Sequence, residues 1–560
     1  MFFEENSYAS VWMKQYLRGY FMRKRFSLLT VSLVVVLSLA AGAFLNNVIS
    51  SDSIYEQLSK FKDVLSITEK YYVEDIDSQK LTEAAVVGLL EELDPHSNYI
   101  PASHLQRIHE EFQGSFEGIG IEYQVLNDTL MVVAPIVGGP SEALGILAGD
   151  KIIQIDDTSC IGITQAGVQK KLRGPKGTRV EVSIVRPGMA GTLDFAIVRD
   201  KIPLYTVGAA FMVDQETGYI QVTRFAATTH DELLEAMGKL KAAGMKKVVL
   251  DLRSNAGGYL EQAFKMVDEF LPKGKKVVYT KGRRQEFDDE YVSSGSGRLL
   301  EAPLIVLVDN GSASASEIVA GAVQDWDRGL IVGETSFGKG LVQREFSLKD
   351  GSALRLTTAR YYTPSGRLIQ RDYGDDRLAY TRAAYEREEE EGENIGHQAE
   401  QDSVRPVFKT LSLGRTVYGG GGITPDYIIK SDKLTEYAAH LRQGNAFFEF
   451  ATKYGEQNGI AMKQEYGNDA ARFVRDFKVT EEIMDQFLDL AKAKKIEFKE
   501  DLFEKDRVYI EAYIKANLAR RLWGTEGYAR VMLSIDSQFK GGMALFPEAE
   551  KISRSLSSLK

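Results

Sequence analysis

The sequence has little that would stabilise a fold through covalent or metal cross-links. Cys160 is the only cysteine among 560 residues, which excludes an intramolecular disulfide framework and leaves no Cys/His cluster for structural zinc. A net charge of −10 argues against a nucleic-acid-binding protein, because the chain as a whole would be repelled by phosphates. With 44% hydrophobic residues and a length suited to about three or four domains, the chain should fold by packing alone.

Charged residues are also missing from Phe26 to Ser51, whereas residues 1–25 carry a net charge of +3 and leave −13 for the rest. About 20 apolar residues cross roughly 30 Å of hydrocarbon. We therefore expect residues 26–46 to form one transmembrane anchor behind a cytoplasmic basic leader, residues 1–25. Arg23-Lys24-Arg25 should hold the N-terminus inside, so that the single-pass protein has its body outside the cytoplasm, on the periplasmic side in a bacterium.

Two other interpretations of residues 26–46 stay open. The small residues Ala41-Gly42-Ala43 fit a cleavable signal peptide. A buried helix of a soluble domain is the second alternative, although such helices are rarely uncharged on every face. The length of the apolar run and the long leader favour the uncleaved anchor.

Residues 52–112 predict an N-terminal helical domain. Apolar residues recur three and four positions apart in SIYEQLSKFKDVLSITEKYYVEDI. A second helix begins near Leu81 and should end before Asp94-Pro95, because the residue before a proline is pushed out of the helical conformation. We expect these helices to be packing elements and His96 to be a loop residue bonded to backbone.

Residues 113–200 consist of short β-rich runs separated by turn residues. One run carries Gly118-Ile119-Gly120-Ile121, and GGPSEALGILAGDKIIQIDD resembles the corresponding part of a PDZ domain. The resemblance implies that the glycine loop offers backbone N–H groups to a peptide's terminal carboxylate, while the adjacent strand edge adds the peptide as a further strand. A β-domain without a ligand is the alternative.

Residues 201–430 alternate strand-like and helix-like runs, the pattern of parallel strands joined by crossover helices. The runs VVLDL and LIVLV are almost uniformly apolar, as in strands buried on both faces. Asp350-Gly351 separates two alternating runs and predicts a β-hairpin. Loops that follow strands and open helices usually carry the chemistry of such sheets. Residues 251–258, with the pair Gly257-Gly258, and residues 310–317 form two such loops.

A serine in the second loop could be a nucleophile if a base reached it. None of the six histidines lies in either loop, although His230 opens a predicted helix. Lys339 has glycine and apolar neighbours in FGKGLVQ, where desolvation would lower its pKa and leave an amine able to take a serine proton. On an extended segment Gln343 shares a face with Lys339 and could orient it.

Plainer explanations exist for these residues. Ser314 and Glu317 fit a capping box, so Ser314 could merely cap the helix that follows it. Ser312 or Ser316 could be the reactive serine instead, and Lys339 could be a solvated residue of a glycine-rich turn.

Several segments, in order, resemble the C-terminal processing peptidases, also called tail-specific proteases, a serine peptidase family with a Ser/Lys pair and an inserted PDZ domain. These segments are LDPHSNYI, GSFEGIGIEY, LAGDKIIQIDD, GYIQVTRF, VVLDLRSNAGG, LVDNGSASASEIVAGAVQD, VGETSFGKGLVQ and GGGGITPD. The resemblance spans residues 52 to about 430 and implies a Clp-protease/crotonase-like α/β core over residues 201–430.

The resemblance also assigns roles to residues. It implies that Ser314 is the nucleophile and Lys339 the general base, with Gln343 supporting the lysine. It places the oxyanion hole at backbone N–H groups of Gly257-Gly258 and of Ala315, where charge develops in the tetrahedral intermediate.

Three features need separate expectations. Asp325 matches an acidic family position with a supporting role. The charged stretch Arg382 to Gln401 should be an exposed helix or loop. Residues 431–560 repeat helical patterns and predict a C-terminal helical domain, for which docking, dimerisation and substrate delivery are all open roles.

These patterns together predict an anchored serine endopeptidase with no metal or organic cofactor. Its PDZ domain would capture accessible C-terminal segments of extracytoplasmic proteins or peptides, and Ser314 would cleave them through an acyl-enzyme. Nucleic acid is not an expected partner, whereas the membrane is, and the chain could form a homo-oligomer. The alternatives are a PDZ scaffold with an inactive peptidase-like core and, more remotely, an acyl-CoA enzyme on the crotonase-like fold.

Overall fold

The first compact unit of the protein comprises residues 1–88, and the second comprises residues 89–560. A computed structural model of the chain describes residues 33, 35–38, 54–126, 128–374, 376–390 and 405–558. In the first unit, α3 (Ile54–Tyr71) and the beginning of α4 (Ser78–Glu91) occupy the two segments whose sequences predict helices.

The expected transmembrane helix over residues 26–46 is the part of the predicted fold that is wrong. Among the described residues, no helix is both long and apolar enough to cross a membrane. In this segment the structure describes residues 33 and 35–38, which are helical. A hydrocarbon core of about 30 Å needs a continuous apolar helix of about 20 residues. The other residues of the segment lie outside the described part of the chain.

Residues 115–203 form a β-rich module around an apolar core of its own. Its main sheet has the order β3–β4–β5–β7–β8, so β3 is a terminal strand. A short pair, β2 with β9, lies where the chain enters and leaves the module. The bounds are β2 (Ser115–Gly118), β3 (Ile121–Leu126), β4 (Thr129–Pro135), α6 (Pro140–Ala143), β5 (Lys151–Ile155), β6 (Thr158–Ser159), α7 (Gln165–Leu172), β7 (Arg179–Val185), β8 (Leu193–Val198) and β9 (Asp200–Pro203).

The larger sheet has the predicted α/β alternation. Its order is β10 (Val207–Met212), β11 (Thr217–Val222), β12 (Lys247–Asp251), β15 (Leu304–Val308), β16 (Leu330–Gly333) and β21 (Tyr427–Ile428). Only the β10–β11 pair among these neighbours is antiparallel. The carboxyl ends of β12, β15 and β16 therefore meet at one edge. The connecting helices are α8 (Thr229–Ala242), α9 (Leu260–Asp268) and α10 (Ala315–Asp325).

A second, antiparallel sheet supports the segment that follows Lys339. Its strands are β1 (Asn98–Ile100), β18 (Ala353–Tyr362), β13 (Lys276–Gly282), β14 (Glu290–Val292) and β17 (Leu341–Ser347). β17 and β18 pair as a hairpin, with Asp350-Gly351 in the turn as predicted and Gly351 at a φ of 85°. Because β17 begins at Leu341, this hairpin fixes the chain immediately after Lys339.

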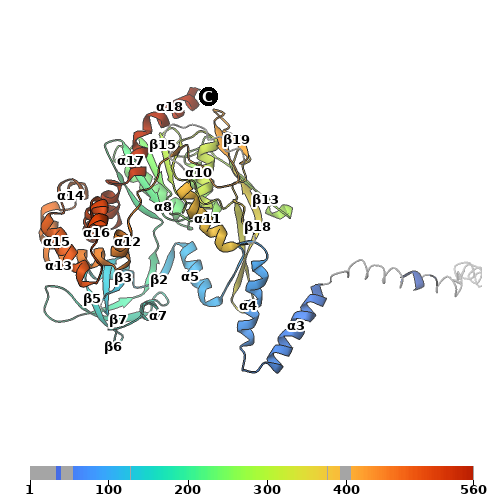
Figure 1. Cartoon of the computed structure of the whole chain (residues 1–560), viewed down its shortest axis with the longest axis horizontal. Coiled ribbons are helices and arrows are strands. Elements are labelled where there is room, and N and C mark those ends of the chain that lie inside the picture. Colours follow the sequence, from blue (N-terminus) through green and yellow to red (C-terminus); the bar gives the residue numbers. More distant parts are fainter. Residues whose placement is uncertain are drawn as a thin grey trace, which may run out of the picture. The chain divides into compact units, whose positions relative to one another are not determined.

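Both faces of the larger sheet are covered, which explains its uniformly apolar strands. Leu233 of α8, Met266 of α9 and Ile318 of α10 belong to the core on one face. On the other face, Leu307 packs in one cluster with Phe539 of the C-terminal region. Figure 1 shows α17 (Ser537–Ala544) and α18 (Phe546–Ser558) beside β15.

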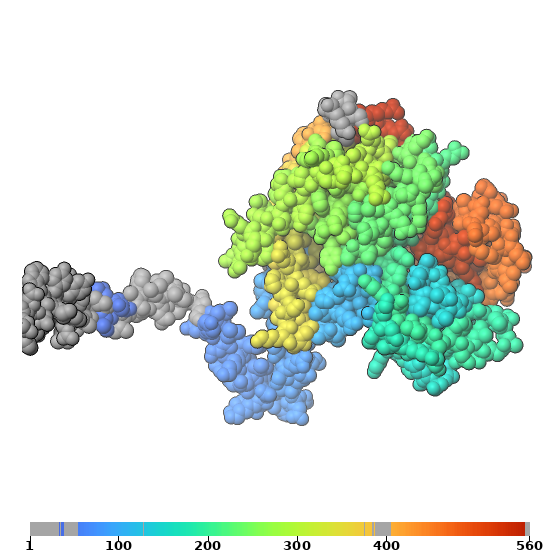
Figure 2. Space-filling view, turned by 180° about the vertical axis from the view of Figure 1, so that it is seen from behind, coloured from blue at the N-terminus to red at the C-terminus, as the bar shows by residue number. Residues whose placement is uncertain are grey.

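The C-terminal region is helical, as predicted, and begins with a bundle that has its own core. The bundle consists of α12 (Glu436–Gln443), α13 (Ala446–Tyr466), α14 (Ala470–Asp476), α15 (Glu481–Ala493) and α16 (Glu500–Leu533). α16 bends at Trp523 and Gly524, whose backbone angles are not helical. Before the bend, Arg520 pairs with Glu122 of β3 at 2.9 Å. Figure 2 shows these orange and red helices against both the teal β-rich module and the green core.

The remaining described elements lie between those already named along the chain. They are α5 (Ala102–Gln113), the 3-10 turn Gln285–Phe287, α11 (Arg377–Glu390), β19 (Val407–Lys409) and β20 (Thr416–Tyr418). The charged stretch 382–401 begins within α11, and its residues 391–401 lie outside the described residues.

Candidate active site

Ser314 occupies a strained turn between β15 and α10. Its φ of 55° and ψ of −110° are rare for a residue with a side chain, and it is the N-cap of α10. Such strain costs on the order of 1–3 kcal/mol and persists where surrounding contacts enforce it, often at functional sites. The nucleophile elbow of the α/β-hydrolases also places a serine at a sharp turn between a strand and a helix.

The turn at Gly257 lies directly against Ser314. A Cβ atom on Gly257 would be 2.8 Å from the Ser314 Cβ and 2.9 Å from the Ala315 nitrogen. Gly257 also has a φ of 99°, in the region that favours glycine. Asn255 joins the two loops, because its carbonyl accepts hydrogen bonds from the Ala313 N–H at 3.0 Å and the Ser316 hydroxyl at 2.8 Å.

The backbone N–H groups predicted for the oxyanion hole differ in availability. The Gly257 N–H donates to the Asn255 Oδ1 at 2.9 Å. Gly258 forms a parallel bridge with Phe225. In this bridge the Phe225 N–H donates to the Gly257 carbonyl and the Tyr259 N–H donates to the Phe225 carbonyl, so the Gly258 N–H is not used.

Ala315 is the first residue of α10, where a backbone N–H has no partner within the helix. Gly258 and Ala315 are therefore better placed as donors than Gly257, whose contribution is the space that its missing side chain leaves.

The Lys339 side chain is half-buried and is held by Gln343. Its Nζ donates to the Gln343 Oε1 at 2.8 Å, and the Gln343 Nε2 in turn donates to the His96 carbonyl. Burial, reinforced by the Arg355 charge, lowers the pKa of Lys339 to about 8, although Glu317 oppositely stabilises the ammonium. At pH 7.4 a group of this pKa is roughly 20% neutral, so a basic amine is available.

Glu317 connects Ser314 to Lys339, a role that the sequence motif does not reveal. Its Oε2 accepts from the backbone N–H of Ser314 at 2.8 Å and of Lys339 at 2.9 Å. Its Oε1 accepts from the Ser336 hydroxyl at 2.6 Å and the Gly338 N–H at 2.7 Å. Burial nevertheless raises the pKa of this carboxyl. The capping-box spacing was the available sequence signal, but it indicates only the contact with Ser314.

The other serines of the loop have structural partners. The Ser312 hydroxyl donates to the Leu252 carbonyl at 2.8 Å, and Ser312 and Ser316 are both fully buried. Ser314, by contrast, is half-buried. Of the three serines, Ser314 is the one with a solvent-exposed surface.

His230 and His96 both have other partners and are not placed as the base. His230 lies on α8, and its Nε2 is 3.0 Å from the Glu269 Oε1. His96 is in the loop before β1, and its Nε2 lies 3.0 Å from the Tyr380 hydroxyl. Burial and the neighbouring Lys339 charge lower the pKa of His96 to about 4.

Asp325 lies at the far end of α10 from Ser314. Its Oδ1 accepts from the Arg367 guanidinium at 2.5 Å, and both side chains are fully buried. The Oδ2 accepts from the Ser365 N–H at 2.9 Å. These contacts hold the turn after β18.

The predicted peptide-binding loop, Gly118 to Ile121, joins β2 to the terminal strand β3. Gly120 has a φ of 74°, and its carbonyl accepts from the Ile136 N–H at 3.0 Å. The Ile119 carbonyl accepts from the Ser141 hydroxyl at 2.6 Å. With these carbonyls engaged within the module, the loop is held in a fixed shape. β3 has β4 as its neighbour on one side of the sheet order only.

Comparison with known proteins identifies relatives of this chain and of its parts. The model of peptidase family S41 matches residues 216–375, and a PDZ-domain model matches residues 131–186. The model of the N-terminal domain of the activating protease CtpB matches residues 41–103, and a family of unknown function matches residues 437–524. The carboxy-terminal-processing protease of Bartonella bacilliformis is 41% identical over 346 residues, covering 61% of this chain and 78% of that protein. CtpA of Bacillus subtilis is 36% identical over 326 residues, covering 58% and 68%.

Among solved structures, the photosystem II D1 C-terminal processing protease is 30% identical and covers 55% of this chain and 89% of that chain, with a TM-score of 0.32. The identity to the Bartonella protein over most of that protein's length decides the family. The chain belongs to the carboxy-terminal processing proteases of peptidase family S41, serine-type peptidases that carry a PDZ domain.

Proposed function

We propose that this protease uses Ser314 as its nucleophile and Lys339 as its general base. The observation that carries the proposal is the shared carboxylate of Glu317, one oxygen of which accepts from the backbone N–H groups of both residues. A fixed separation between nucleophile and base is what an acyl-transfer site requires, since misplacement by about 1 Å can cost on the order of 100-fold in rate.

In the proposed reaction, the Ser314 Oγ attacks the scissile carbonyl carbon while its proton passes to the Lys339 Nζ. The carbonyl oxygen becomes an oxyanion, which the N–H groups of Gly258 and Ala315 stabilise. The tetrahedral intermediate then expels the amine, which takes its proton from Lys339. Lys339 then takes a proton from a water molecule, whose oxygen attacks the acyl carbonyl carbon. As the bond from that carbon to the Ser314 Oγ breaks, Lys339 returns the proton to the Oγ and the new C-terminal carboxyl group is released. Gln343 keeps the amine directed toward the serine.

We also propose that the PDZ domain selects substrates through their C-terminal segments. A peptide would add to the open side of β3, with its carboxylate at the loop from Gly118 to Ile121. We further propose that the catalytic body and its substrates lie outside the cytoplasm, because the basic cluster Arg23-Lys24-Arg25 precedes the uncharged residues 26–51. Protease added to spheroplasts should digest the catalytic body if it lies outside the cytoplasm.

A homo-oligomer stays a prediction, which light scattering would check.

Hydrolysis of fluorescent casein by the purified chain tests the function. We expect the wild-type protein to cleave it and Ser314→Ala to leave it intact while still binding peptides. Mass spectrometry of proteins trapped by Ser314→Ala would then identify substrates and their C-termini. An inactive wild-type protein would favour the alternative of a PDZ scaffold with an inactive core.

A further inference from the structure

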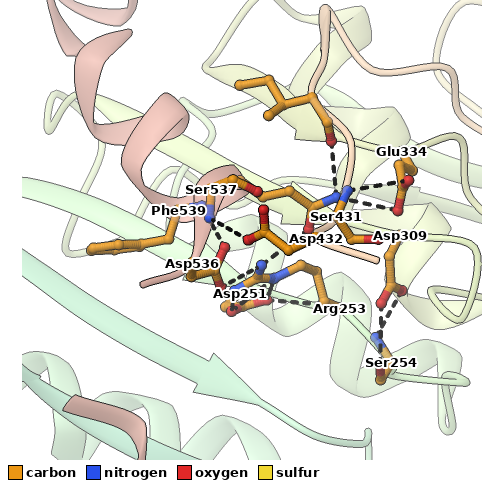
Figure 3. Close-up of polar contacts among 12 residues, drawn as sticks. Asp251, Arg253, Ser254, Asp309, Glu334, Ser431, Asp432, Asp536, Ser537 and Phe539 are labelled. Atoms are coloured by element: carbon orange, nitrogen blue, oxygen red, sulfur yellow. Dashed lines mark hydrogen bonds and ion pairs between the residues drawn. The ribbon is translucent and has the colours of Figure 1, made fainter. Parts of the chain in front are cut away.

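The first turn of α17 reaches the edge of the sheet on which the active-site loops lie. Figure 3 shows Asp536 of this turn facing Arg253, which follows the carboxyl end of β12. The Arg253 Nη1 donates to the Asp536 Oδ2 at 2.8 Å and to the Gln538 Oε1 at 3.0 Å. Two residues of the C-terminal region thus contact the chain only a few residues before Gly257 and Gly258.

The contacts of Arg253 on its other side belong to the catalytic core. Its Nη2 donates to the Asp251 Oδ2 at 2.6 Å, and its Nε lies 3.0 Å from the Asp251 Oδ1. The same Oδ2 accepts from the Tyr219 hydroxyl at 2.7 Å. Burial opposes the charge of Arg253, but the carboxylates of Asp251 and Asp536 together raise its pKa well above the usual range. Asp251 and Asp536 therefore hold the guanidinium from opposite sides.

Gln538 extends the network to the neighbouring strands. It is 2% exposed, and its Nε2 donates to the Ile429 carbonyl at 2.9 Å, just after β21, and to the Glu334 Oε2 at 3.2 Å, just after β16. Its two amide ends are therefore used on different strands, which fixes the orientation of the side chain. Arg253 cannot move without breaking contacts to β12 and α17 at once.

The loop that follows Arg253 has little freedom to absorb a displacement. Ser254 has a φ of 56°, and its N–H and hydroxyl donate to Asp309 at 2.8 Å and 3.1 Å. The next residue, Asn255, binds Gly257 through its Oδ1. A shift of Arg253 would therefore be passed through this short, hydrogen-bonded turn to the glycines beside Ser314.

We propose that Asp536 and Gln538 are positioning residues for the reaction, which act through Arg253 to hold the loop that carries the Gly258 oxyanion donor. This inference rests on the proposed function and gives the C-terminal region a part in catalysis. Deleting the region would remove this effect together with the apolar cover of the sheet, so the test requires single substitutions in the full chain.

Asp536→Ser and Gln538→Met separate positioning from folding. The Asp536 Oδ1 also caps α17 by accepting from the Phe539 N–H at 2.9 Å, and serine keeps that role while losing the carboxylate that Arg253 needs. Methionine keeps the length of Gln538 without its amide. Asp469→Ser is the matched control, because Asp469 caps α14 through the Arg472 N–H and carries the same substitution away from the core.

We expect Asp536→Ser and Gln538→Met to lower kcat on casein about 10- to 100-fold, with KM within about twofold of wild type. Their Tm should equal the Tm of the control variant Asp469→Ser. Affinity for a peptide boronate, whose tetrahedral adduct needs the oxyanion donors, should fall by the same factor as kcat. In an Arg253→Met background, Asp536→Ser should add no further loss.

Three results would overturn the inference. They are a kcat within twofold of wild type in both variants, an equal loss in Asp469→Ser, and a loss of kcat without a change in boronate affinity. A wild-type protein that does not cleave casein would contradict the proposed function as well, whereas an active wild type with unaffected variants contradicts the inference alone.

Discussion

The loops around Ser314 and the open edge of β3, the proposed sites of cleavage and of peptide capture, are stabilised in opposite ways. At Ser314 the backbone is strained and is held by buried side chains, above all by the Glu317 carboxylate, which accepts four hydrogen bonds. At β3 the functional group is the backbone itself, left on the terminal strand of a sheet. Bond cleavage needs fixed side chains, whereas peptide capture needs free N–H and C=O groups. Single substitutions should therefore affect the core far more than the PDZ edge.

The largest effect is expected when either reacting group of the core is removed. Ser314→Ala and Lys339→Ala should each lower kcat on casein by on the order of 10⁴-fold or more, because no other group in the site replaces the nucleophile or the base. Circular dichroism and Tm should stay close to wild type. Ser316→Ala is the control, since that hydroxyl only supports the Asn255 carbonyl, and it should keep most of the activity. If Ser316→Ala were inactive and Ser314→Ala active, the nucleophile would be misassigned.

Glu317→Gln should produce the second largest effect, a loss in kcat on the order of 10²- to 10³-fold. An amide is isosteric with the carboxylate, but its NH₂ would face backbone N–H groups on one side and leave them unpaired in a buried site. The link between Ser314 and the Lys339 loop would then loosen.

Glu269→Gln provides the matched control for Glu317→Gln. Glu269 is a second buried carboxylate of the core and accepts from the Arg298 N–H at 2.8 Å, away from Ser314. Its variant should lose stability without losing kcat. Equal activity losses in the two variants would mean that Glu317 acts through stability alone.

The pH dependence of kcat/KM follows from the lowered pKa of Lys339. The neutral amine is the reactive form, so activity should rise with pH through about 8 and then level off. Roughly 1% of the lysine is neutral at pH 6 and about 90% at pH 9, which predicts an increase of about 90-fold. His96, with a pKa near 4, does not titrate in this range. A rise that continues toward pH 10 would indicate a solvated lysine.

Gln343→Ala should lower kcat by about 10-fold, because Lys339 keeps its burial but loses the acceptor that orients its Nζ. Gln343→Glu gives a sharper test, since a carboxylate beside the ammonium favours the protonated form. The pH profile of Gln343→Glu should move to an apparent pKa above 8, whereas an unchanged profile would contradict the contact between the two side chains.

The sequence indicated which residues could react, but not the contacts that support them. Ser314 and Lys339 lie in short glycine- and serine-rich motifs that local rules can recognise. The contact of Gln538 with Arg253 joins residues 285 positions apart, and no periodicity or motif carries that information. The engagement of the Gly257 N–H depends on the rotamer of Asn255, which a sequence does not contain. The membrane helix was inferred from the uncharged apolar run and the basic cluster before it, and none of the described helices is both long and apolar enough to form a span.

The smallest effect is expected at the PDZ edge, from Gly120→Ala. The φ of 74° disfavours a side chain, and a Cβ atom there would lie 3.0 Å from the Ile202 Cδ1 and 3.3 Å from the Gly139 Cα. The loop should shift by a few tenths of an ångström, which weakens carboxylate capture without touching Ser314. We expect KM for a protein with a free C-terminus to rise about threefold, and kinetics on a short fluorogenic peptide to stay unchanged, since such a peptide needs no capture.

Gly145→Ala is the control, because Gly145 has a φ of 80° but no atom within 4 Å of its Cβ position. It matches the backbone strain without the contact, so its KM should remain that of the wild type. A rise in KM shared by both variants, or a loss on the short peptide as well, would show that the PDZ edge is not a separate capture site.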